Sequence, residues 1–164
     1  MTREDAEALL TEAGLVADDA FPLFEAALAC AVHDDPDRDA DAARAVADEG
    51  VARLAARLET ESPEEAIAES MAGDLRLQGY LMTYDHPDNA DVIAVAERRK
   101  GIPVSIGVFY LHAARRCELE VRGVDFPGHF LLRIETREGP MALDPFSEGR
   151  VVLPSELSRR ALRA

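Results

Sequence analysis

The spacing of apolar residues changes near residue 118, and this change predicts two kinds of structure. Before it, apolar residues recur at intervals of three and four, which is typical of amphipathic helices. After it, they alternate with polar residues in short runs bounded by glycine and proline, which indicates strands. The chain therefore predicts an α+β fold, with N-terminal helices and a buried central helix packed on a small antiparallel sheet.

Four acidic, alanine-rich helices are expected first: residues 3–13, a helix starting near Pro22, residues 39–59, and a helix opened by Ser62 and Pro63. A further helix over 90–100 would be capped by Asp88 or Asn89 and followed by Gly101. The central helix, residues 102–116, is apolar on most of its circumference. This pattern predicts a buried helix.

The strands are expected at residues 119–125, 130–136, 140–144 and 150–153. If the second and third strands pair about a turn between Arg137 and Glu138, Leu131 faces Asp144 and His129 is a diagonal neighbour of Asp144. Such neighbours lie roughly 7–8 Å apart, within side-chain reach. Asp144 could then orient His129 as a general base. A purely structural tie across the hairpin explains the pair equally simply.

Length and composition predict one domain over residues 1–164, with a helical region at 1–80 and the core helix and sheet at 84–153. The start lacks an apolar leader and no run is long enough to span a bilayer, so a cytoplasmic protein is expected. Cys30 and Cys117 do not form a disulfide framework. Cys30 lies in an apolar helical run and is expected to be an inert core thiol.

Net charge is −14, and all of the excess lies in the first 70 residues, which hold 19 acidic and 5 basic residues. Residues 71–164 hold 13 of each. This balance argues against nucleic acid and anionic membranes as partners. It permits a basic partner, although a solvated acidic helix face also accounts for it. The sequence does not define an oligomeric state.

Two other histidines, His86 and His112, are weaker site candidates. His86, with Asp85 and Asp88, could suggest a metal site, but the spacing fits a proline-containing turn better. His112 lies in the apolar central helix and is expected to be packed or at its rim. No spacing in the chain predicts a metal or a cofactor.

Four segments together resemble the SirB-type transglutaminase-like family: residues 84–89 (Tyr-Asp-His-Pro-Asp-Asn), 97–105 (Glu-Arg-Arg-Lys-Gly-Ile-Pro-Val-Ser), 123–130 (Gly-Val-Asp-Phe-Pro-Gly-His-Phe) and 143–146 (Leu-Asp-Pro-Phe). The resemblance implies the fold shared by transglutaminases and papain-like proteases. In that fold a cysteine at a buried helix N-terminus works with a histidine and an aspartate on the adjoining sheet. By the resemblance, His129 takes the base position and Asp144 the orienting position.

The nucleophile position departs from this pattern, because Pro103 stands where active transglutaminases have cysteine. Three accounts follow. The domain could be catalytically silent and bind a protein or peptide, or act in regulation, in a cleft beside Pro103 and His129. It could instead be a peptide or amide hydrolase that uses Ser105, His129 and Asp144. Catalysis by Cys117 is disfavoured, since Cys117 lies about 21 Å along the helix from Pro103. Transglutaminase or cysteine-protease activity is therefore not expected.

Overall fold

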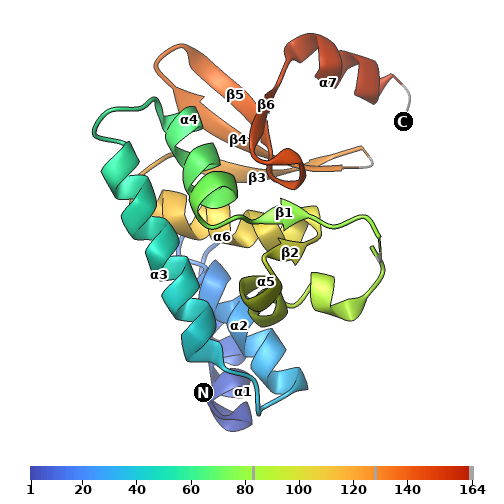
Figure 1. Cartoon of the computed structure of the whole chain (residues 1–164). Helices are drawn as coiled ribbons and strands as arrows, with labels where there is room; N and C mark the ends of the chain where they lie inside the picture. The colour runs from blue at the N-terminus through green and yellow to red at the C-terminus, as the bar shows by residue number, and fades with distance from the viewer. Residues whose placement is uncertain (83, 128, 163–164) are drawn as a thin grey trace.

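The structure is a computed structural model that describes residues 1–82, 84–127 and 129–162. Helix α6 (Pro103–Arg116) lies between a four-stranded sheet and the N-terminal helices (Figure 1). Its side chains Ile106, Phe109 and Tyr110 are almost fully buried. The predicted buried central helix is thus confirmed, and the α+β architecture with it.

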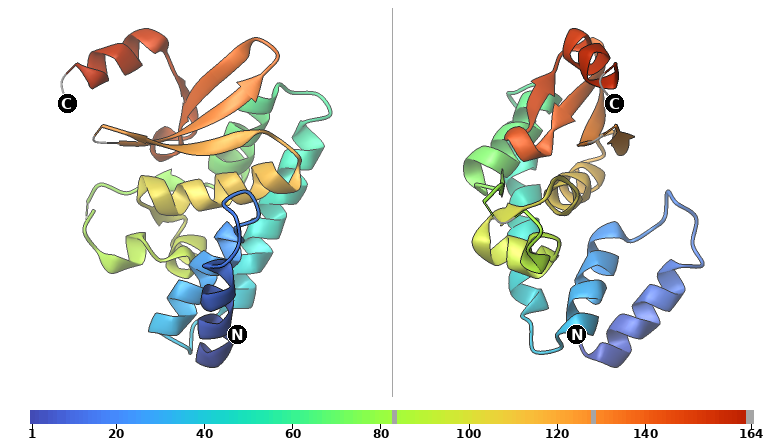
Figure 2. Two further views of the ribbon diagram at one scale, coloured as in Figure 1. Left: turned by 180° about the vertical axis from the view of Figure 1, so that it is seen from behind. Right: turned by 90° about the vertical axis from the view of Figure 1, so that its right-hand side faces the viewer.

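The sheet is antiparallel, with strand order β3-β4-β5-β6. Its strands are β3 (Val121–Phe126), β4 (His129–Thr136), β5 (Gly139–Asp144) and β6 (Arg150–Val152). Leu132 pairs with Leu143 and Thr136 with Gly139, which is the predicted register. The last helix, α7 (Pro154–Ala161), lies beyond the sheet from α6 (Figure 2). Its Leu157 helps to line an apolar cavity of about 270 Å³ against β3, β4 and β5.

The N-terminal helices are α1 (Arg3–Ala13), α2 (Leu23–Asp34), α3 (Ala40–Arg57) and α4 (Pro63–Ala68). Thr2 and Asp5 form a capping box at the start of α1, and Asp39 caps α3 by accepting from the Ala42 amide. A π-helical turn, η1 (Glu69–Asp74), continues α4. All four predicted helices are present.

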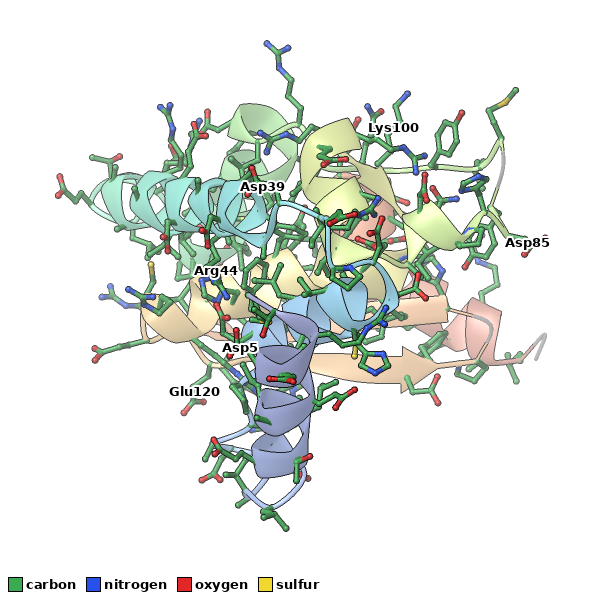
Figure 3. All side chains as sticks on the ribbon, turned by 90° about the horizontal axis from the view of Figure 1, so that it is seen from below. Asp5, Asp39, Arg44, Asp85, Lys100 and Glu120 are labelled. Atoms are coloured by element: carbon green, nitrogen blue, oxygen red, sulfur yellow. The ribbon has the colours of Figure 1, made fainter. Side chains whose placement is uncertain are left out.

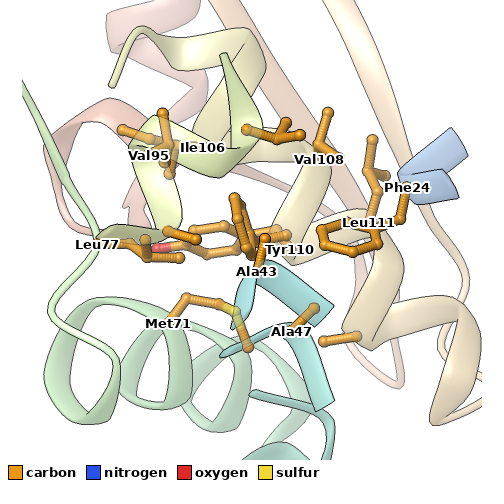
Figure 4. Close-up of a cluster of buried hydrophobic side chains, with 14 of the residues drawn as sticks. Phe24, Ala43, Ala47, Met71, Leu77, Val95, Ile106, Val108, Tyr110 and Leu111 are labelled. Carbon is orange, nitrogen blue, oxygen red and sulfur yellow. The ribbon is translucent and has the colours of Figure 1, made fainter. Parts of the chain in front are cut away.

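One apolar cluster joins the N-terminal helices to α6 and the sheet. Phe24 of α2 meets Phe109 of α6 edge to face, with ring centroids 5.4 Å apart. Figure 4 shows other members around α6, including Ala43, Met71 and Leu77. Burial of this much apolar surface is the main stabilising contribution to such a fold.

The segment before α6 differs from the prediction. A two-residue parallel pair, β1 (Gln78–Gly79) with β2 (Lys100–Gly101), brackets a 3₁₀ turn η2 (Pro87–Asn89) and helix α5 (Val92–Arg98). Asp91, not Asp88 or Asn89, caps α5, by accepting from two backbone amides. The helix ends at Arg99 in a left-handed conformation, so the expected role of Gly101 is wrong. Gly101 is needed instead because Ser105 and Val95 leave no room for a side chain.

Candidate active-site region at the start of helix α6

The first turn of α6 is held by a serine hydroxyl. Pro103 occupies the first helical position, where its missing N–H costs nothing. The buried Ser105 hydroxyl donates to the Asn89 carbonyl at 2.5 Å and accepts from the Ile102 amide at 3.2 Å. The Ile102 amide also donates to the same Asn89 carbonyl at 3.0 Å. These bonds tie the turn that precedes α5 to the start of α6.

This arrangement leaves Ser105 poorly suited to attack a substrate. Its side chain is 3% exposed, and its single proton is directed to a backbone carbonyl rather than to an imidazole. A serine nucleophile needs a base within hydrogen-bond reach. Pro103 beside it is also buried, and the solvent-facing residue of this first turn is Val104.

The ends of β4 and β5 hold the second polar group. His129 begins β4 and Asp144 ends β5, and the His129 Nε2 atom lies 3.0 Å from Asp144 Oδ1. The contact predicted from the hairpin register is confirmed. Because a carboxylate only accepts, Nε2 carries the proton and Nδ1 is the ring nitrogen left for other partners.

Asp144 is surrounded by donors. It is 1% exposed, and its Oδ1 atom also accepts from the Phe146 and Ser147 amides at 3.1 and 3.2 Å. The Ser147 hydroxyl donates to Oδ2 at 3.0 Å. Asp144 thereby caps the 3₁₀ turn η3 (Pro145–Ser147) while it orients His129. These contacts of Asp144 are compatible both with a structural tie across the hairpin and with a role in orienting His129.

Aromatic side chains connect the pair to the rest of this region. The side chain of His129 is 22% exposed, and its ring lies edge to face with Phe146 at 6.4 Å between centroids. Phe146 in turn meets Tyr84, in the loop after β1, at 6.3 Å. Phe146 packs so closely on Gly79 of β1 that no side chain fits there.

A second close approach positions β4 on α6. Phe130, next to His129, fills the space left by Gly107 of α6 and Gly123 of β3. An added Cβ on Gly107 would lie 2.6 Å from the Phe130 ring. The glycines therefore permit the start of β4 to lie directly against the helix. Figure 1 shows the end of β3, the start of β4 and the start of α6 on the same side of the molecule.

The two cysteines lie away from this region. Cys30 is exposed, so its expected burial in the core is wrong: it falls on the outer side of α2, whose inner side is formed by residues such as Leu28 and Val32. Cys117 is partly buried just after α6, and burial raises the pKa of its thiol. Neither position resembles that of an activated thiolate.

The other predicted histidines have local roles. His86 accepts from the Asp88 amide through Nδ1 at the start of η2, as expected of a turn residue. His112 packs beside Phe24 at 4.7 Å between ring centroids, and burial lowers its pKa. Within the part of the chain that the structure describes, no group of three or more histidine, cysteine, aspartate or glutamate residues could hold a metal ion.

Sequence reasoning missed two residues of this region. Asn89 is fully buried, and its side chain donates to the Tyr84 carbonyl and accepts from Arg98 Nη2. Ser147 completes the contacts of Asp144. The proline-containing turn around Asn89 was a visible signal, but nothing local indicated that its carbonyl would meet Ser105, sixteen residues away.

The fold, a buried helix against an antiparallel sheet, is that of a transglutaminase-like domain. The family model of the transglutaminase-like superfamily matches residues 41–164, and the chain belongs to this superfamily. Within the described residues, no helix is long and apolar enough to cross a membrane. No solved structure is similar enough to the chain to count as a match.

Its relatives include uncharacterised bacterial proteins. The chain is 34% identical over 150 residues to a UPF0162 protein of Xylella fastidiosa, covering 89% of this chain and 53% of the relative. It is 32% identical over 135 residues to a UPF0162 protein of Pseudomonas aeruginosa, covering 80% and 49%. These matches confirm the SirB-type resemblance. The chain spans about half the length of these relatives. A shorter match, 38% identical over 69 residues, is to F-box only protein 21 of Mus musculus, covering 42% of this chain and 11% of that protein.

Proposed function

We propose that this transglutaminase-like domain binds an extended polypeptide and does not cleave it. The observation that carries the proposal is the state of Ser105. Its hydroxyl is buried and bonded to the Asn89 carbonyl and the Ile102 amide. By the family resemblance, Pro103 stands where active transglutaminases have cysteine. The hydroxyl that contacts the pair on the sheet is that of Ser147, which donates to Asp144, while Ser105 bonds to backbone groups.

The surface around the start of α6 favours a polypeptide ligand. Leu81, Met82 and Tyr84 in the loop after β1 are 74%, 84% and 47% exposed, and Val104 on the first turn of α6 is 51% exposed. Single exposed apolar side chains are ordinary on protein surfaces. Here the loop and the helix start are tied together through Asn89, which bonds to Tyr84, Ile102 and Ser105. We define Leu81, Met82, Tyr84 and Val104 as the apolar rim.

The pair on the sheet supplies a polar contact for such a ligand. In the neutral tautomer that donates from Nε2 to Asp144, the His129 ring would present Nδ1 as an acceptor. A backbone N–H of an extended peptide is a suitable donor. His129 would then act in recognition, with Asp144 holding the ring in position.

The alternative is a hydrolase with Ser105, His129 and Asp144 as catalytic residues. Ser105 would have to leave the Asn89 carbonyl and turn toward His129 in the complex. That movement breaks the bonds that hold the first turn of α6, so the observed contacts favour the binding function.

A binding experiment tests the proposal. A bead-bound library of random short peptides is incubated with the labelled wild-type chain and with the variant Met82→Ser/Val104→Ser. We expect retention by a subset of beads and a loss of about tenfold in affinity for the variant, because two exposed apolar contacts are removed. The matched control is Leu15→Ser/Val16→Ser, which changes two exposed apolar residues in the loop between α1 and α2. This loop lies across the molecule from β1 (Figure 2). Equal loss in both variants would contradict the proposed surface.

A labelling experiment tests the alternative. A fluorophosphonate probe, which modifies activated serines, is expected to leave the wild-type chain unlabelled. Labelling that disappears in both Ser105→Ala and His129→Ala would show that the chain is a serine hydrolase, and the proposal would be wrong.

A further inference from the structure

Seven arginines in the described part of this acidic protein are paired with carboxylates. Arg44 pairs with Glu25 and Asp41, and Arg57 pairs with Asp74 and Glu61. Arg38, Arg53, Arg133 and Arg150 each have a carboxylate partner as well. Six other arginines, spread over several elements, have no carboxylate partner among the described residues: Arg3, Arg115, Arg116, Arg122, Arg137 and Arg159.

Three further cations, at the β1–β2 pair, also lack a carboxylate partner. Arg76, Arg99 and Lys100, here called the cationic strip, have no carboxylate within ion-pair distance in the part of the chain that is described. The parallel pairing of Gln78 with Lys100 brings the end of η1 beside the end of α5, so the three residues lie together. The Nη1 atom of Arg99 is buried and has no hydrogen-bond partner among the described residues.

The backbone gives no reason for arginine at two of these positions. Arg76 and Arg99 have φ angles of 59° and 60°, in the left-handed region where glycine or asparagine is favoured. Both side chains are carried there at a conformational cost that glycine would not incur. Glu118 and Glu148 adopt the same conformation elsewhere in the chain, and Arg99 in this conformation ends α5.

Tyr80 joins the cationic strip to the apolar rim. The Lys100 Nζ atom lies 5.0 Å and the Arg98 guanidinium 5.8 Å from the centre of its ring. Arg98 is not a free cation, since it lies 3.5 Å from Asp88. The Tyr80 amide donates to the Gly101 carbonyl, and Leu81 and Met82 follow directly. Figure 3 shows Lys100 on the upper side of the view and the loop that carries Asp85 to its right.

We infer that the cationic strip recognises acidic residues of the bound polypeptide, whose apolar residues contact the apolar rim. This inference rests on the proposed function and specifies the ligand as an acidic polypeptide segment. An extended strand advances about 3.3 Å per residue, so one short segment can reach both surfaces. A nucleic acid is a poorer match, because the net charge of −14 repels a polyanion as a whole while a peptide places a few charges locally.

The test uses three fluorescein-labelled probes and fluorescence anisotropy. The first is a short peptide in which glutamate alternates with leucine, the second has glutamine in place of glutamate, and the third is a single-stranded oligothymidine. We expect the glutamate peptide to bind about tenfold more tightly than the glutamine peptide at low salt, with the preference shrinking as sodium chloride is added.

Two charge-matched variants separate the cationic strip from overall charge. Arg99→Gln/Lys100→Gln should abolish the preference for glutamate. Arg116→Gln/Arg137→Gln removes two exposed arginines from the end of α6 and from the β4–β5 turn, and should keep the preference. Melting temperatures of the variants identify any loss that is due to unfolding.

The outcomes are distinguishable. Equal binding of both peptides overturns the inference and leaves the proposed function in place. Tighter binding of oligothymidine than of the glutamate peptide also overturns it, in favour of a polyanion site. Binding of neither peptide contradicts the proposed function, and the inference fails with it.

Discussion

The start of α6 and the adjoining ends of β4 and β5 are both polar and buried, yet they use their side chains differently. At the helix start, Ser105 bonds only to backbone groups. At the strand ends, Asp144 also bonds to backbone amides but holds a side chain, His129, whose second nitrogen remains available. At the start of α6, the polar side chain is fully used in hydrogen bonds within the protein. At the ends of β4 and β5, the His129 ring keeps a nitrogen that can bind a ligand.

Under the proposed function, this difference would correspond to an acyl-transfer arrangement in which the histidine–aspartate half is present and the nucleophile half is not. A chain crossing at Asn89 brings a carbonyl to the start of α6, and buried backbone groups require partners. The Ser105 hydroxyl meets that requirement. Asp144 has enough acceptor capacity to serve both the η3 turn and the His129 ring.

The largest expected effect is on the sheet side. Asp144→Ala should lower the free energy of unfolding by about 3 kcal/mol, because it leaves buried amides and an imidazole N–H without their acceptor. Urea unfolding measures this. Asp144→Asn, which keeps one carbonyl oxygen, should lose less. A loss below about 1 kcal/mol for Asp144→Ala would show that the carboxylate is not central to this region.

The second largest effect is expected in the reactivity of a thiol placed at either end of α6. In a Cys30→Ser/Cys117→Ser background, Val104→Cys places a thiol at the exposed helix start. We expect iodoacetamide to modify it about tenfold faster than a lone Cys117, since helix N-termini lower a thiol pKa and burial raises that of Cys117. Mass spectrometry follows the reaction. Equal rates of modification at positions 104 and 117 would show that the two ends of α6 do not differ in their effect on a thiol pKa.

The background variant has a prediction of its own. Cys30→Ser/Cys117→Ser should bind the peptide beads as the wild type does, because neither cysteine lies in the proposed surface. A loss of binding, with the melting temperature unchanged, would show that a thiol takes part.

Ser105→Ala should have a smaller effect, lowering the free energy of unfolding by about 1 kcal/mol through the lost hydroxyl bonds. Peptide binding should remain. Ser147→Ala is the matched variant on the sheet side and should cost less, since its hydroxyl is only one of the donors to Asp144. If Ser147→Ala proves the more costly change in urea unfolding, the contrast between the two regions is wrong.

The smallest effect concerns His112, in the same helix. Burial lowers its folded-state pKa, so the unfolded chain binds the proton more tightly. The contribution of this residue to stability should be present above about pH 7 and fall as pH drops through roughly 6.5, the ordinary histidine value. Melting temperatures of wild type and His112→Gln across this range test it. An identical pH dependence in both would contradict the assignment.

Much of the fold was predictable because the patterns involved are local. The all-round apolar character of residues 102–116 predicted α6, and the alternation around the Arg137–Glu138 turn predicted the register that joins His129 to Asp144. A hairpin register depends on neighbouring residues and turn length alone. The contact between these two side chains therefore followed from the chain itself.

Other features depend on distant partners and were wrong or missed. Cys30 was expected in the core, but the inner side of α2 is set by its contacts with α6, which leave Cys30 outside. The cap of α5 moved to Asp91 because Asn89 is engaged with Tyr84, Arg98 and the start of α6. The strands β1 and β2 are two residues long, which is too short to show the alternation of apolar and polar residues that predicts a strand.

The sequence by itself determined which segments are helix and strand, which helix is central, and which histidine and aspartate meet. Periodicity and turn length encode these features within a few residues. Only the tertiary structure decided that Ser105 is directed to Asn89 and that Arg76, Arg99 and Lys100 lie together without acidic partners. Both depend on where segments far apart in the chain come to rest against each other, and no local spacing records that.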